Sequence, residues 1–341
     1  MPHISTSHPA IELIGVTKKY PGSRRGISDH ANLITALDNV DLSVAQGETF
    51  GLVGESGSGK TTMGRLIVGL EKPDNGVVRV AGDDIHTLRG AGLKAFRRQV
   101  QMIFQDPYQS LNPYMSVKDT VAEPLIIKGG LNHAQRIKKL AQTLNLAGLT
   151  PVENYLYSYP HQLSGGQRQR VAIARAMVLD PQYIVADEPA SMLDASTSIQ
   201  IFQLLNRIQR ARNVTLVFIT HSLAAAHYLC HKIAVIYRGR VMETGPVSTI
   251  IRNPRHPYTQ ALLDALPEYG HSRPGHRYGA LRSQARDEVT EGGCPFFSRC
   301  NFAQEDRCSR KQPDLKPVDE ETKAACLLVS CSDPGGPENA E

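Results

Sequence analysis

The sequence predicts an α/β fold, in which a parallel sheet carries an inserted helical subdomain and a small cysteine-rich C-terminal extension. Three observations support this prediction. Short β-rich runs alternate with turns and helical stretches, apolar residues recur at helical spacing between about 107 and 180, and five of the six cysteines lie beyond residue 290. Buried strands joined by crossover helices form parallel sheets, which favours the α/β class.

The expected elements follow one another along the chain. Strands are predicted at 11–16, 35–44 and 49–53, then a helix over 60–70 and strands at 77–81 and 100–104. After the helical segment, strands at 183–186 and 214–220 flank a helix over 196–210. A hairpin over 232–243 turns at Arg238 and Gly239, and a last helix covers 258–266.

The length of 341 residues suggests roughly two units. We expect a main domain over 10–266, with its helical insertion at about 107–180, and a cysteine-rich segment over 294–331. The stretch 267–293 is rich in Gly, Pro, Arg and His without apolar periodicity, which is typical of a linker. The terminal SDPGGPENAE is expected to be disordered.

Composition excludes several classes of protein. Hydrophobic residues make up 41% of the chain, which is too many for wholesale disorder. No apolar run approaches the roughly 20 residues that span a bilayer, and the N-terminal MPHISTSHPA lacks the features of an export signal. We therefore expect a cytosolic chain. The net charge of +5 is small for this length and assigns no partner.

A glycine-rich loop follows the expected strand over 49–53. It fits G-x-x-x-x-G-K-[ST] and comprises Gly54, Glu55, Ser56, Gly57, Ser58, Gly59, Lys60, Thr61 and Thr62. Its backbone N–H groups and the helix N-terminus behind it suit phosphate oxygens. Lys60 would reach the β- and γ-phosphates, and Thr61 would ligate Mg²⁺. A glycine-rich turn can arise by chance, but the strand, loop and helix context indicates nucleotide binding.

Asp187 and Glu188 follow the expected strand over 183–186. Asp187 would hold the metal ion directly or through water, and Glu188 would polarise the attacking water. Such an acidic pair is, by itself, more often part of an exposed loop. Together with the glycine-rich loop it indicates nucleotide hydrolysis.

Between these motifs lies the pentapeptide LSGGQ, residues 163–167. With it the chain resembles the ATP-binding cassette (ABC) ATPases over about residues 10–330. The resemblance implies a P-loop NTPase fold of the RecA-like type, with ATP and Mg²⁺ as cofactors. Further family elements match in order: an adenine-stacking aromatic, the Q-loop, the D-loop and the switch histidine, at Tyr20, Gln105, Asp194 and His221.

The resemblance also implies a division of roles. Glu188, His221 and Gln105 would be catalytic, and Thr61, Gln105 and Asp187 would hold Mg²⁺. A Gly-Gly pair that opens a helix is a second anion-binding N-terminus, and in this family it faces the nucleotide of a partner subunit. The residues expected at that interface are Ser164, Gly165, Gly166, Gln167 and Asp194.

Some of these positions have plainer interpretations. Without the other motifs, Tyr20 would be an edge-strand aromatic and His221 a satisfied core histidine. Two positions depart from the family pattern. Met192 replaces a small residue, and Ser222 replaces the Asp that usually follows the switch histidine. Neither departure removes a catalytic group.

Three stretches indicate a particular branch of this family: QDPYQSLNP at 105–113, NPRHPYTQALLDALP at 253–267, and the cysteine segment. They resemble the ATPase subunits of oligopeptide and dipeptide importers, especially the second of two unequal ATPases. The implied partners are a second ATPase subunit in a heterodimer, two transmembrane permease subunits and an extracytoplasmic solute-binding protein, with no nucleic acid. The implied location is peripheral, on the cytoplasmic face of the inner membrane, where the chain would power uptake of peptides or similar small solutes.

A different class remains as an alternative: an ABC ATPase of DNA repair, chromosome organisation or translation. The first two carry coiled coils or zinc modules inside the cassette, and the insertion here is too short for either. Translation factors of this family need two cassettes in one chain, and only one is present.

The cysteines divide into two sets. Cys230 stands alone in a helical stretch and suits a small core residue. Cys294, Cys300, Cys308 and Cys326 cluster in sequence, with Cys331 close behind, and clustered thiols in a reducing compartment indicate metal. Their gaps are wider than structural zinc prefers, although zinc and unliganded thiols remain open. The resemblance to the importer ATPases implies a [4Fe–4S] cluster on the first four.

Overall fold

The computed structural model describes residues 9–22, 33–265, 279, 281–282 and 292–329. Most of the expected linker at 267–293, and also Cys331 and the terminal SDPGGPENAE, lie outside the described residues.

A mixed sheet of eight strands forms the centre of the molecule, in the order β11-β12-β10-β9-β3-β8-β7-β6. Its parallel part consists of β3 (Thr49–Val53), β6 (Val100–Ile103), β7 (Tyr183–Asp187), β8 (Thr215–Thr220) and β9 (Lys232–Tyr237). β3, β7 and β8 are buried along their whole length, as expected for strands covered on both faces. The predicted parallel α/β sheet is confirmed.

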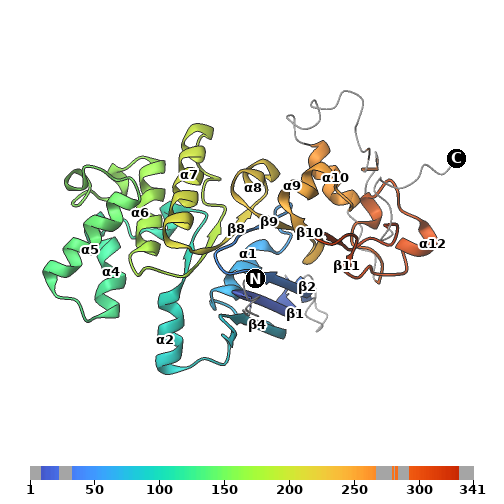
Figure 1. Ribbon diagram of the computed structural model, residues 1–341, viewed down its shortest axis with the longest axis horizontal. Coiled ribbons are helices and arrows are strands. Elements are labelled where there is room, and N and C mark those ends of the chain that lie inside the picture. Colours follow the sequence, from blue (N-terminus) through green and yellow to red (C-terminus); the bar gives the residue numbers. More distant parts are fainter. Residues whose placement is uncertain (1–8, 23–32, 266–278, 280, 283–291, 330–341) are drawn as a thin grey trace, which may run out of the picture.

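A second, antiparallel sheet contains β1 (Ile11–Pro21), β2 (Leu33–Val44), β4 (Asn75–Val80) and β5 (Asp83–Asp84), in the order β2-β1-β4-β5. Three of these strands were predicted, but their separation into a sheet of their own was not. Helix α1 (Lys60–Ile67) lies between the two sheets (Figure 1). Its Met63, Leu66 and Ile67 share one hydrophobic core with residues of both sheets.

Helices occupy the chain between β6 and β7. They are α3 (Pro107–Ser110), α4 (Val117–Lys128), α5 (His133–Leu146) and α6 (Gly165–Met177), with 3₁₀ turns at Val152–Asn154 and Pro160–Gln162. Ser116, Asn132 and Ser164 cap the N-termini of α4, α5 and α6 through their side chains. These helices pack around a hydrophobic cluster of their own and lie at one end of the molecule (Figure 1).

Five further helices are described between residues 90 and 264: α2 (Gly90–Gln99), which precedes β6, and α7 (Ala195–Arg212), α8 (Leu223–Leu229), α9 (Val247–Arg252) and α10 (Pro257–Asp264). Helix α7 buries Ile201, Leu204 and Leu205 against the sheet. The helices α7 and α10 were predicted, α8 coincides with the helical stretch expected around Cys230, and α2 and α9 were not predicted. Cys230 caps the C-terminus of α8 and is 6% exposed, which confirms it as a core residue.

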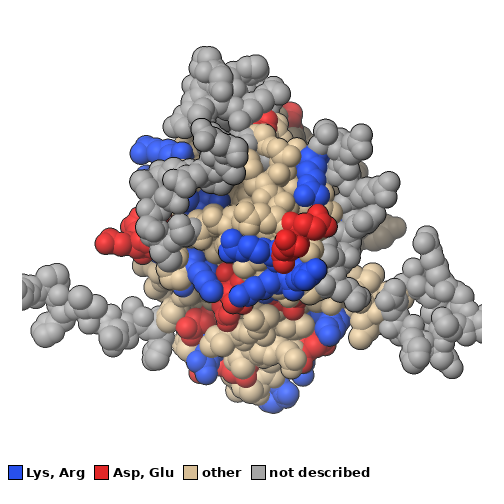
Figure 2. Space-filling view, turned by 90° about the vertical axis from the view of Figure 1, so that its right-hand side faces the viewer, with Lys and Arg blue, Asp and Glu red and all other residues tan. Residues whose placement is uncertain are grey.

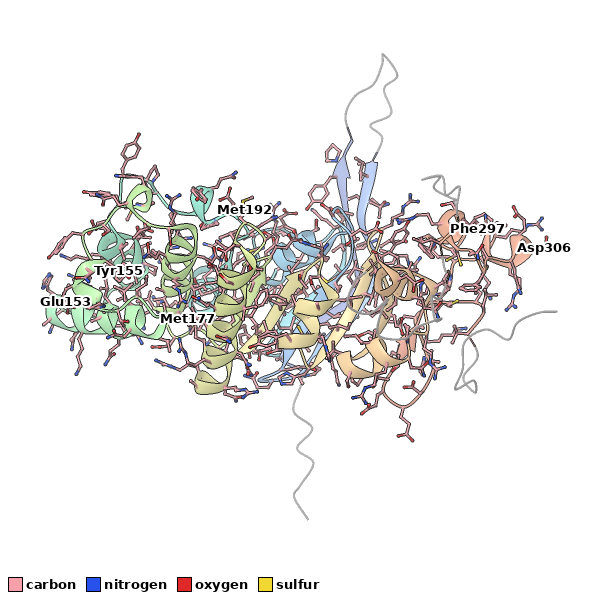
Figure 3. The ribbon with its side chains drawn as sticks, turned by 90° about the horizontal axis from the view of Figure 1, so that it is seen from above. Glu153, Tyr155, Met177, Met192, Phe297 and Asp306 are labelled. Atoms are coloured by element: carbon pink, nitrogen blue, oxygen red, sulfur yellow. The ribbon has the colours of Figure 1, made fainter. Side chains whose placement is uncertain are left out.

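The C-terminal segment continues the main sheet. Its short strands β11 (Lys316–Pro317) and β12 (Lys323–Ala324) follow β10 (Arg240–Pro246), with Glu243 opposite Ala324. It also holds a 3₁₀ turn, Phe297–Arg299, and the short helix α12 (Glu305–Cys308). This segment lies at the end of the molecule opposite the helices α4 to α6. In Figure 3, its Phe297 and Asp306 lie far from Glu153 and Tyr155.

Candidate functional site

The loop from Gly54 to Gly59 joins β3 to α1, where the sequence predicted a phosphate site. Gly59 forms the N-cap of α1 with φ +103°, in the region that favours glycine. A Cβ on Gly54 would lie 2.1 Å from the carbonyl oxygen of Ile236. Both glycines are therefore required by the backbone path, which aims the start of α1 into the site.

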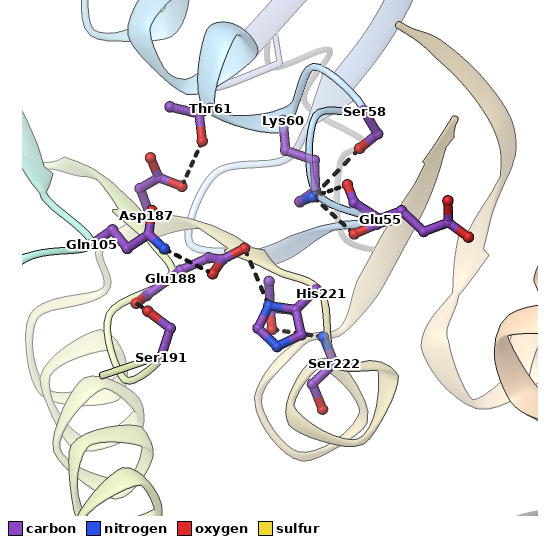
Figure 4. Close-up of polar contacts among 12 residues, drawn as sticks. Glu55, Ser58, Lys60, Thr61, Gln105, Asp187, Glu188, Ser191, His221 and Ser222 are labelled. Atoms are coloured by element: carbon purple, nitrogen blue, oxygen red, sulfur yellow. Dashed lines mark hydrogen bonds and ion pairs between the residues drawn. The ribbon is translucent and has the colours of Figure 1, made fainter. Parts of the chain in front are cut away.

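Lys60 folds back over this loop. Its Nζ donates to the carbonyl oxygens of Gly54 at 2.8 Å and Glu55 at 2.7 Å, and to Ser58 Oγ at 3.4 Å (Figure 4). Lys60 is only 4% exposed, and burial lowers the pKa of its ammonium group, against the attraction of nearby carboxylates. The Lys60 ammonium group is therefore a buried charge that contacts only neutral oxygens through its hydrogen bonds. This arrangement favours the binding of an anion.

Thr61 and Asp187 bring the two phosphate motifs together. Thr61 Oγ1 donates to Asp187 Oδ1 at 3.2 Å. Burial raises the pKa of Asp187, which is 3% exposed, while the Thr61 hydroxyl opposes that shift. A hydroxyl beside a buried carboxylate is an oxygen donor pair of the kind that Mg²⁺ accepts.

Glu188 is contacted from two neighbouring strands. Gln105 Nε2 donates to Glu188 Oε2 at 3.3 Å, and His221 Nδ1 lies 3.2 Å from Glu188 Oε1 (Figure 4). The three residues follow β6, β7 and β8, which are parallel neighbours, so their carboxyl ends meet at one edge of the sheet. The predicted catalytic residues are therefore brought together.

The backbone at Glu188 is strained. Its φ is +42°, and its N–H donates to the carbonyl oxygen of Ile219 at 3.0 Å. The N–H and hydroxyl of Ser191 both lie 3.1 Å from the Glu188 carbonyl oxygen and close the turn. Glu188 and residues of the phosphate loop line the same cavity.

Most of the predicted residues line one cavity of about 640 Å³, whereas Gly54, Ser58 and Asp187 lie outside its described lining. Its lining includes predicted residues from both motifs and three that the sequence analysis missed, namely Ala36, Ser191 and Met192. Met192 had been noted only as a departure from the family pattern. The spacing of Ser191 from Glu188 is a turn signal that could have identified it.

The LSGGQ residues stand apart from this cavity. Ser164 and Gln167 form a capping box at the start of α6, with Ser164 N–H donating to Gln167 Oε1 at 2.9 Å and Gln167 N–H to Ser164 Oγ at 3.2 Å. A Cβ on Gly166 would lie 2.5 Å from Thr197 Cγ2. Neither these residues nor Gly165 line the described cavity.

Asp194 caps the following helix. Its carboxylate accepts from Ser196 Oγ at 2.6 Å, and from the N–H and hydroxyl of Thr197 at 3.0 and 2.7 Å. These donors lower the pKa of the Asp194 carboxyl well below its usual range. Like the LSGGQ residues, Asp194 lies outside the described lining of the cavity.

Tyr20 stands at the end of β1. Its hydroxyl donates to the carboxylate of Glu71, and Lys18 Nζ lies 5.5 Å from its ring centroid. Burial, with the Glu71 hydrogen bond in second place, raises the pKa of the Tyr20 hydroxyl. Tyr20 is not among the described residues that line the cavity, so its expected contact with adenine stays a prediction.

The four clustered cysteines are free and largely covered. Burial raises the pKa of Cys294 to about 11 and that of Cys300 to about 12, and the charges of Cys308 and Cys326 add to both shifts. Among the described residues, however, no three His, Cys, Asp or Glu side chains form a group that could hold a metal ion. The geometry therefore does not support the predicted iron–sulfur cluster.

Comparison with known proteins gives the family. The ABC transporter family matches residues 37–191, and the family described as oligopeptide/dipeptide transporter, C-terminal region, matches residues 242–308. The putative oligopeptide transport ATP-binding protein YkfD of Bacillus subtilis is 41% identical over 298 residues, 86% of this chain and 90% of the relative. The di/tripeptide transport ATP-binding protein DppF of Pseudomonas aeruginosa is 39% identical over 312 residues, 91% of this chain and 95% of the relative.

Solved structures agree on the fold. The dimeric ATP-binding cassette MJ0796, in a post-hydrolysis state with ADP and Pi, is 34% identical with a TM-score of 0.61, and covers 70% of this chain and 98% of its own. CbiO1 of Clostridium perfringens is 25% identical with a TM-score of 0.63, and covers 78% of this chain and 98% of its own. With relatives of about 40% identity over most of its length and the cassette fold of known ABC proteins, the chain belongs to the ABC transporter family, as an ATP-binding subunit of the oligopeptide/dipeptide type.

Proposed function

We propose that the chain binds and hydrolyses MgATP and thereby powers import of peptides or similar small solutes through a membrane permease. The observation that carries this proposal is the meeting of Gln105, Glu188 and His221 in the cavity that also contains Lys60. The names of the relatives, which are peptide-transport ATP-binding proteins, support the solute class.

Each side chain has a task in hydrolysis. Lys60 binds the β- and γ-phosphates by exchanging its loop carbonyl partners for phosphate oxygens. Glu188 accepts the proton of the attacking water or orients that water, and His221 with Gln105 holds the carboxylate in place. Thr61, Asp187 and Gln105 are the residues that would hold Mg²⁺, which when bound neutralises charge between the β- and γ-phosphates.

Tyr20 and the dimer interface complete the ATP site in this proposal. Tyr20 stacks on adenine from the end of β1. Ser164, Gly165, Gly166, Gln167 and Asp194 bind the nucleotide of a partner ATPase subunit. Their position outside the cavity supports contact in trans, as does the dimeric state of MJ0796 with ADP and Pi. We expect the partner to be a second, unequal ATPase subunit.

The helices between β6 and β7 form the inserted helical subdomain that meets the permease. Large side chains in its loops and in α3 face solvent: Tyr114 is 89% exposed, Tyr157 72% and, in α3, Tyr108 56%. Tyr108 belongs to the segment that follows Gln105, so permease contact and Mg²⁺ coordination would be linked through one short stretch. Two permease subunits and an extracytoplasmic solute-binding protein complete the proposed assembly.

The chain would then sit peripherally on the cytoplasmic face of the inner membrane. None of the helices among the described residues is long and apolar enough to cross a bilayer. The domain limits that we propose are 10–266 for the cassette, 267–293 for the linker and 294–331 for the C-terminal extension.

The alternative of a DNA-repair or translation ATPase is not supported. The relatives reported above are transport proteins, and the second matching family is a transporter C-terminal region. Among the described residues of the C-terminal face, Lys and Arg side chains lie next to Asp and Glu side chains (Figure 2). Where it is described, this face therefore carries both charges, unlike the basic patch that is typical of nucleic-acid binding.

A direct test reconstitutes the chain with its permease, partner ATPase and binding protein in proteoliposomes. Peptide-stimulated ATP hydrolysis and peptide uptake are expected in the wild type and lost in Lys60→Ala. Stimulation by nucleic acid in place of peptide would contradict the proposal.

For the C-terminal extension we propose, on the cysteine pattern of the sequence alone, a structural [4Fe–4S] cluster on Cys294, Cys300, Cys308 and Cys326, although the described side chains do not form a metal-binding group. The donor set supports this, since iron–sulfur clusters are held by Cys thiolates and the charge of Cys308 contributes to the raised pKa values of Cys294, Cys300 and Cys326. A metal held by these thiolates would cross-link a segment with few regular elements.

Metal analysis and visible absorption of anaerobically purified full-length protein test the cluster. Cys→Ser at each of the four positions is expected to lower iron content and to expose the segment to protease. The matched control Cys230→Ser removes a thiol from the core and is expected to leave iron unchanged. One equivalent of zinc without iron, or no metal at all, would contradict the cluster and leave the ATPase proposal intact.

A further inference from the structure

Glu55, the second residue of the phosphate loop, is held by two residues that are distant in sequence. The guanidinium of Arg299 donates to both carboxylate oxygens, from Nη1 to Oε2 at 2.9 Å and from Nη2 to Oε1 at 3.0 Å. The backbone N–H of Glu55 donates to the hydroxyl oxygen of Tyr258 at 3.0 Å. Its carbonyl oxygen accepts from Lys60. Every polar group of Glu55 is therefore engaged.

Arg299 comes from the cysteine-rich segment, between Cys294 and Cys300. Its backbone is fixed on both sides: the Arg299 N–H donates to the carbonyl oxygen of Phe296 at 3.1 Å, and its own carbonyl accepts from Arg282 at 3.0 Å. Its guanidinium lies 5.7 Å from the ring centroid of Tyr237 and 5.9 Å from that of Phe296.

The rings below Arg299 form a packed cluster. Phe296 is fully buried and meets Tyr237 edge-on with ring centroids 5.4 Å apart, and Tyr258, which is 1% exposed, lies 5.4 Å from Phe296. The same Tyr258 reaches the loop through its hydroxyl. The cysteine-rich segment and α10 thus present two rigid contacts to one residue of the phosphate loop.

The charge at this position matters for phosphate binding. Glu55 lines the cavity, and although its carboxylate points away from the Lys60 ammonium (Figure 4), its charge acts on that ammonium, so an unpaired carboxylate at this position would repel a triphosphate. A bidentate Arg pair neutralises that charge and also fixes its direction. Arg299 itself does not line the cavity among the described residues, so it acts on the nucleotide through Glu55.

We propose that Arg299 is a positioning residue for the phosphate loop, by which the docked C-terminal segment raises the affinity of the cassette for ATP. The inference rests on the proposed ATP site and adds to it a dependence on residues outside the cassette motifs. Displacing the segment would leave the Glu55 carboxylate unpaired beside the phosphates and weaken nucleotide binding without removing any group that touches the nucleotide.

A double-mutant cycle in the full-length protein, assembled in its transporter, tests this proposal. Arg299→Ala is expected to raise KM for ATP about three- to tenfold, while kcat changes less than about twofold. Glu55→Gln removes the charge that needs a partner, and Arg299→Ala in that background is expected to change KM by less than about twofold. Arg299→Lys, which keeps the charge, is expected to restore part of the affinity.

The control is Arg307→Ala, in the same segment. Arg307 donates to the carbonyl oxygen of Leu327 at 2.9 Å and to the side chain of Gln304, and neither partner belongs to the phosphate loop. The KM of Arg307→Ala for ATP is therefore expected to stay within about twofold of the wild type. Thermal melting and protease resistance establish that each variant is folded. If Arg299→Ala does not fold, the comparison of Arg299→Lys in the two Glu55 backgrounds gives the same answer.

Two results would overturn the inference: an unchanged KM in Arg299→Ala, or an equal rise in KM in both Glu55 backgrounds. If Arg299 had a purely structural role, Arg299→Ala would lower the melting temperature equally with and without Glu55→Gln. Its kinetic effect would then not be confined to KM. If Lys60→Ala also left nucleotide affinity unchanged, the proposed ATP site would fail. If Lys60→Ala lost nucleotide affinity and Arg299→Ala did not, the proposed ATP site would be supported and only the role of Arg299 would be rejected.

Discussion

His221 Nδ1 lies 3.2 Å from Glu188 Oε1, although the two residues follow different strands. Gln105 reaches the other carboxylate oxygen, so both oxygens of Glu188 are engaged from opposite sides. The positive φ of Glu188 turns its side chain toward this position. The carboxylate is therefore held in one orientation, which is what its proposed role in directing a water molecule requires.

Glu188→Gln should preserve ATP binding and lower ATP turnover about a hundredfold or more, because the amide keeps the shape and loses the proton acceptor. ATP binding and steady-state hydrolysis in the assembled transporter measure the two effects. Glu153→Gln, an exposed substitution at the far end of the helical segment (Figure 3), is the control and should leave both unchanged. Turnover within a few-fold of wild type in Glu188→Gln would refute the role.

Lys60→Ala should weaken ATP binding by at least about tenfold, equivalent to about 1.4 kcal/mol, because a buried positive charge is lost from the phosphate loop. Titration with a fluorescent nucleotide gives the dissociation constant. Lys94→Ala removes an exposed lysine of α2 and should not change it. Equal affinities for Lys60→Ala and wild type would mean that the phosphates bind elsewhere.

Ser164→Arg should leave ATP binding to the isolated chain within about twofold, because Ser164 does not line the described cavity. It should block the ATP-dependent dimer, which size-exclusion chromatography of the Glu188→Gln protein with its partner subunit would show. Ser248→Arg, on the exposed side of α9, adds the same bulk and charge and should permit the dimer. A nucleotide affinity lost as strongly as in Lys60→Ala would contradict the assignment in trans.

Glu243 predicts a pH dependence of stability. It is fully buried, and burial raises its pKa from 4.5 to about 7, against the N–H donors of Arg255 and His256. The folded chain then holds this proton more tightly than the unfolded chain, so its contribution to the unfolding free energy is fully present below about pH 4.5 and falls as pH rises toward 7.

Urea unfolding at several pH values measures that contribution as the difference between wild type and Glu243→Gln. The difference should decrease by on the order of 3 kcal/mol between pH 4 and pH 8. The exposed substitution Glu320→Gln should follow the wild type throughout. A difference that does not depend on pH would show that Glu243 titrates normally.

Local sequence signals predicted much of the fold. β3 has the expected limits because an apolar run meets a glycine loop directly, and α1 begins where the loop ends. The antiparallel arrangement of β1, β2 and β4 depends on register between distant segments, which no local pattern shows. Helix α9 was missed because its six residues give too short a period to recognise, and its N-cap residue, Pro246, has no capping side chain.

The functional site, too, was predicted only in part from the sequence. Gln105, Glu188 and His221 were predicted because each belongs to a motif and follows a strand, and parallel strands end together. The pairing of Arg299 with Glu55 was not, because it joins residues 244 positions apart and neither belongs to a spacing pattern with the other. The strained backbone of Glu188 also has no sequence signal, since glutamate rarely adopts a positive φ.

At the start of α6, Ser164 and Gln167 already satisfy each other's main-chain N–H groups before any other molecule binds. A bare helix start would hold a phosphate group tightly. In the proposed dimer, a phosphate group of the partner's nucleotide would compete with these internal acceptors for two of the N–H groups at the start of α6, so the contact would gain less free energy and dissociate sooner. A contact of that kind would suit a reversible dimer better than a permanent one.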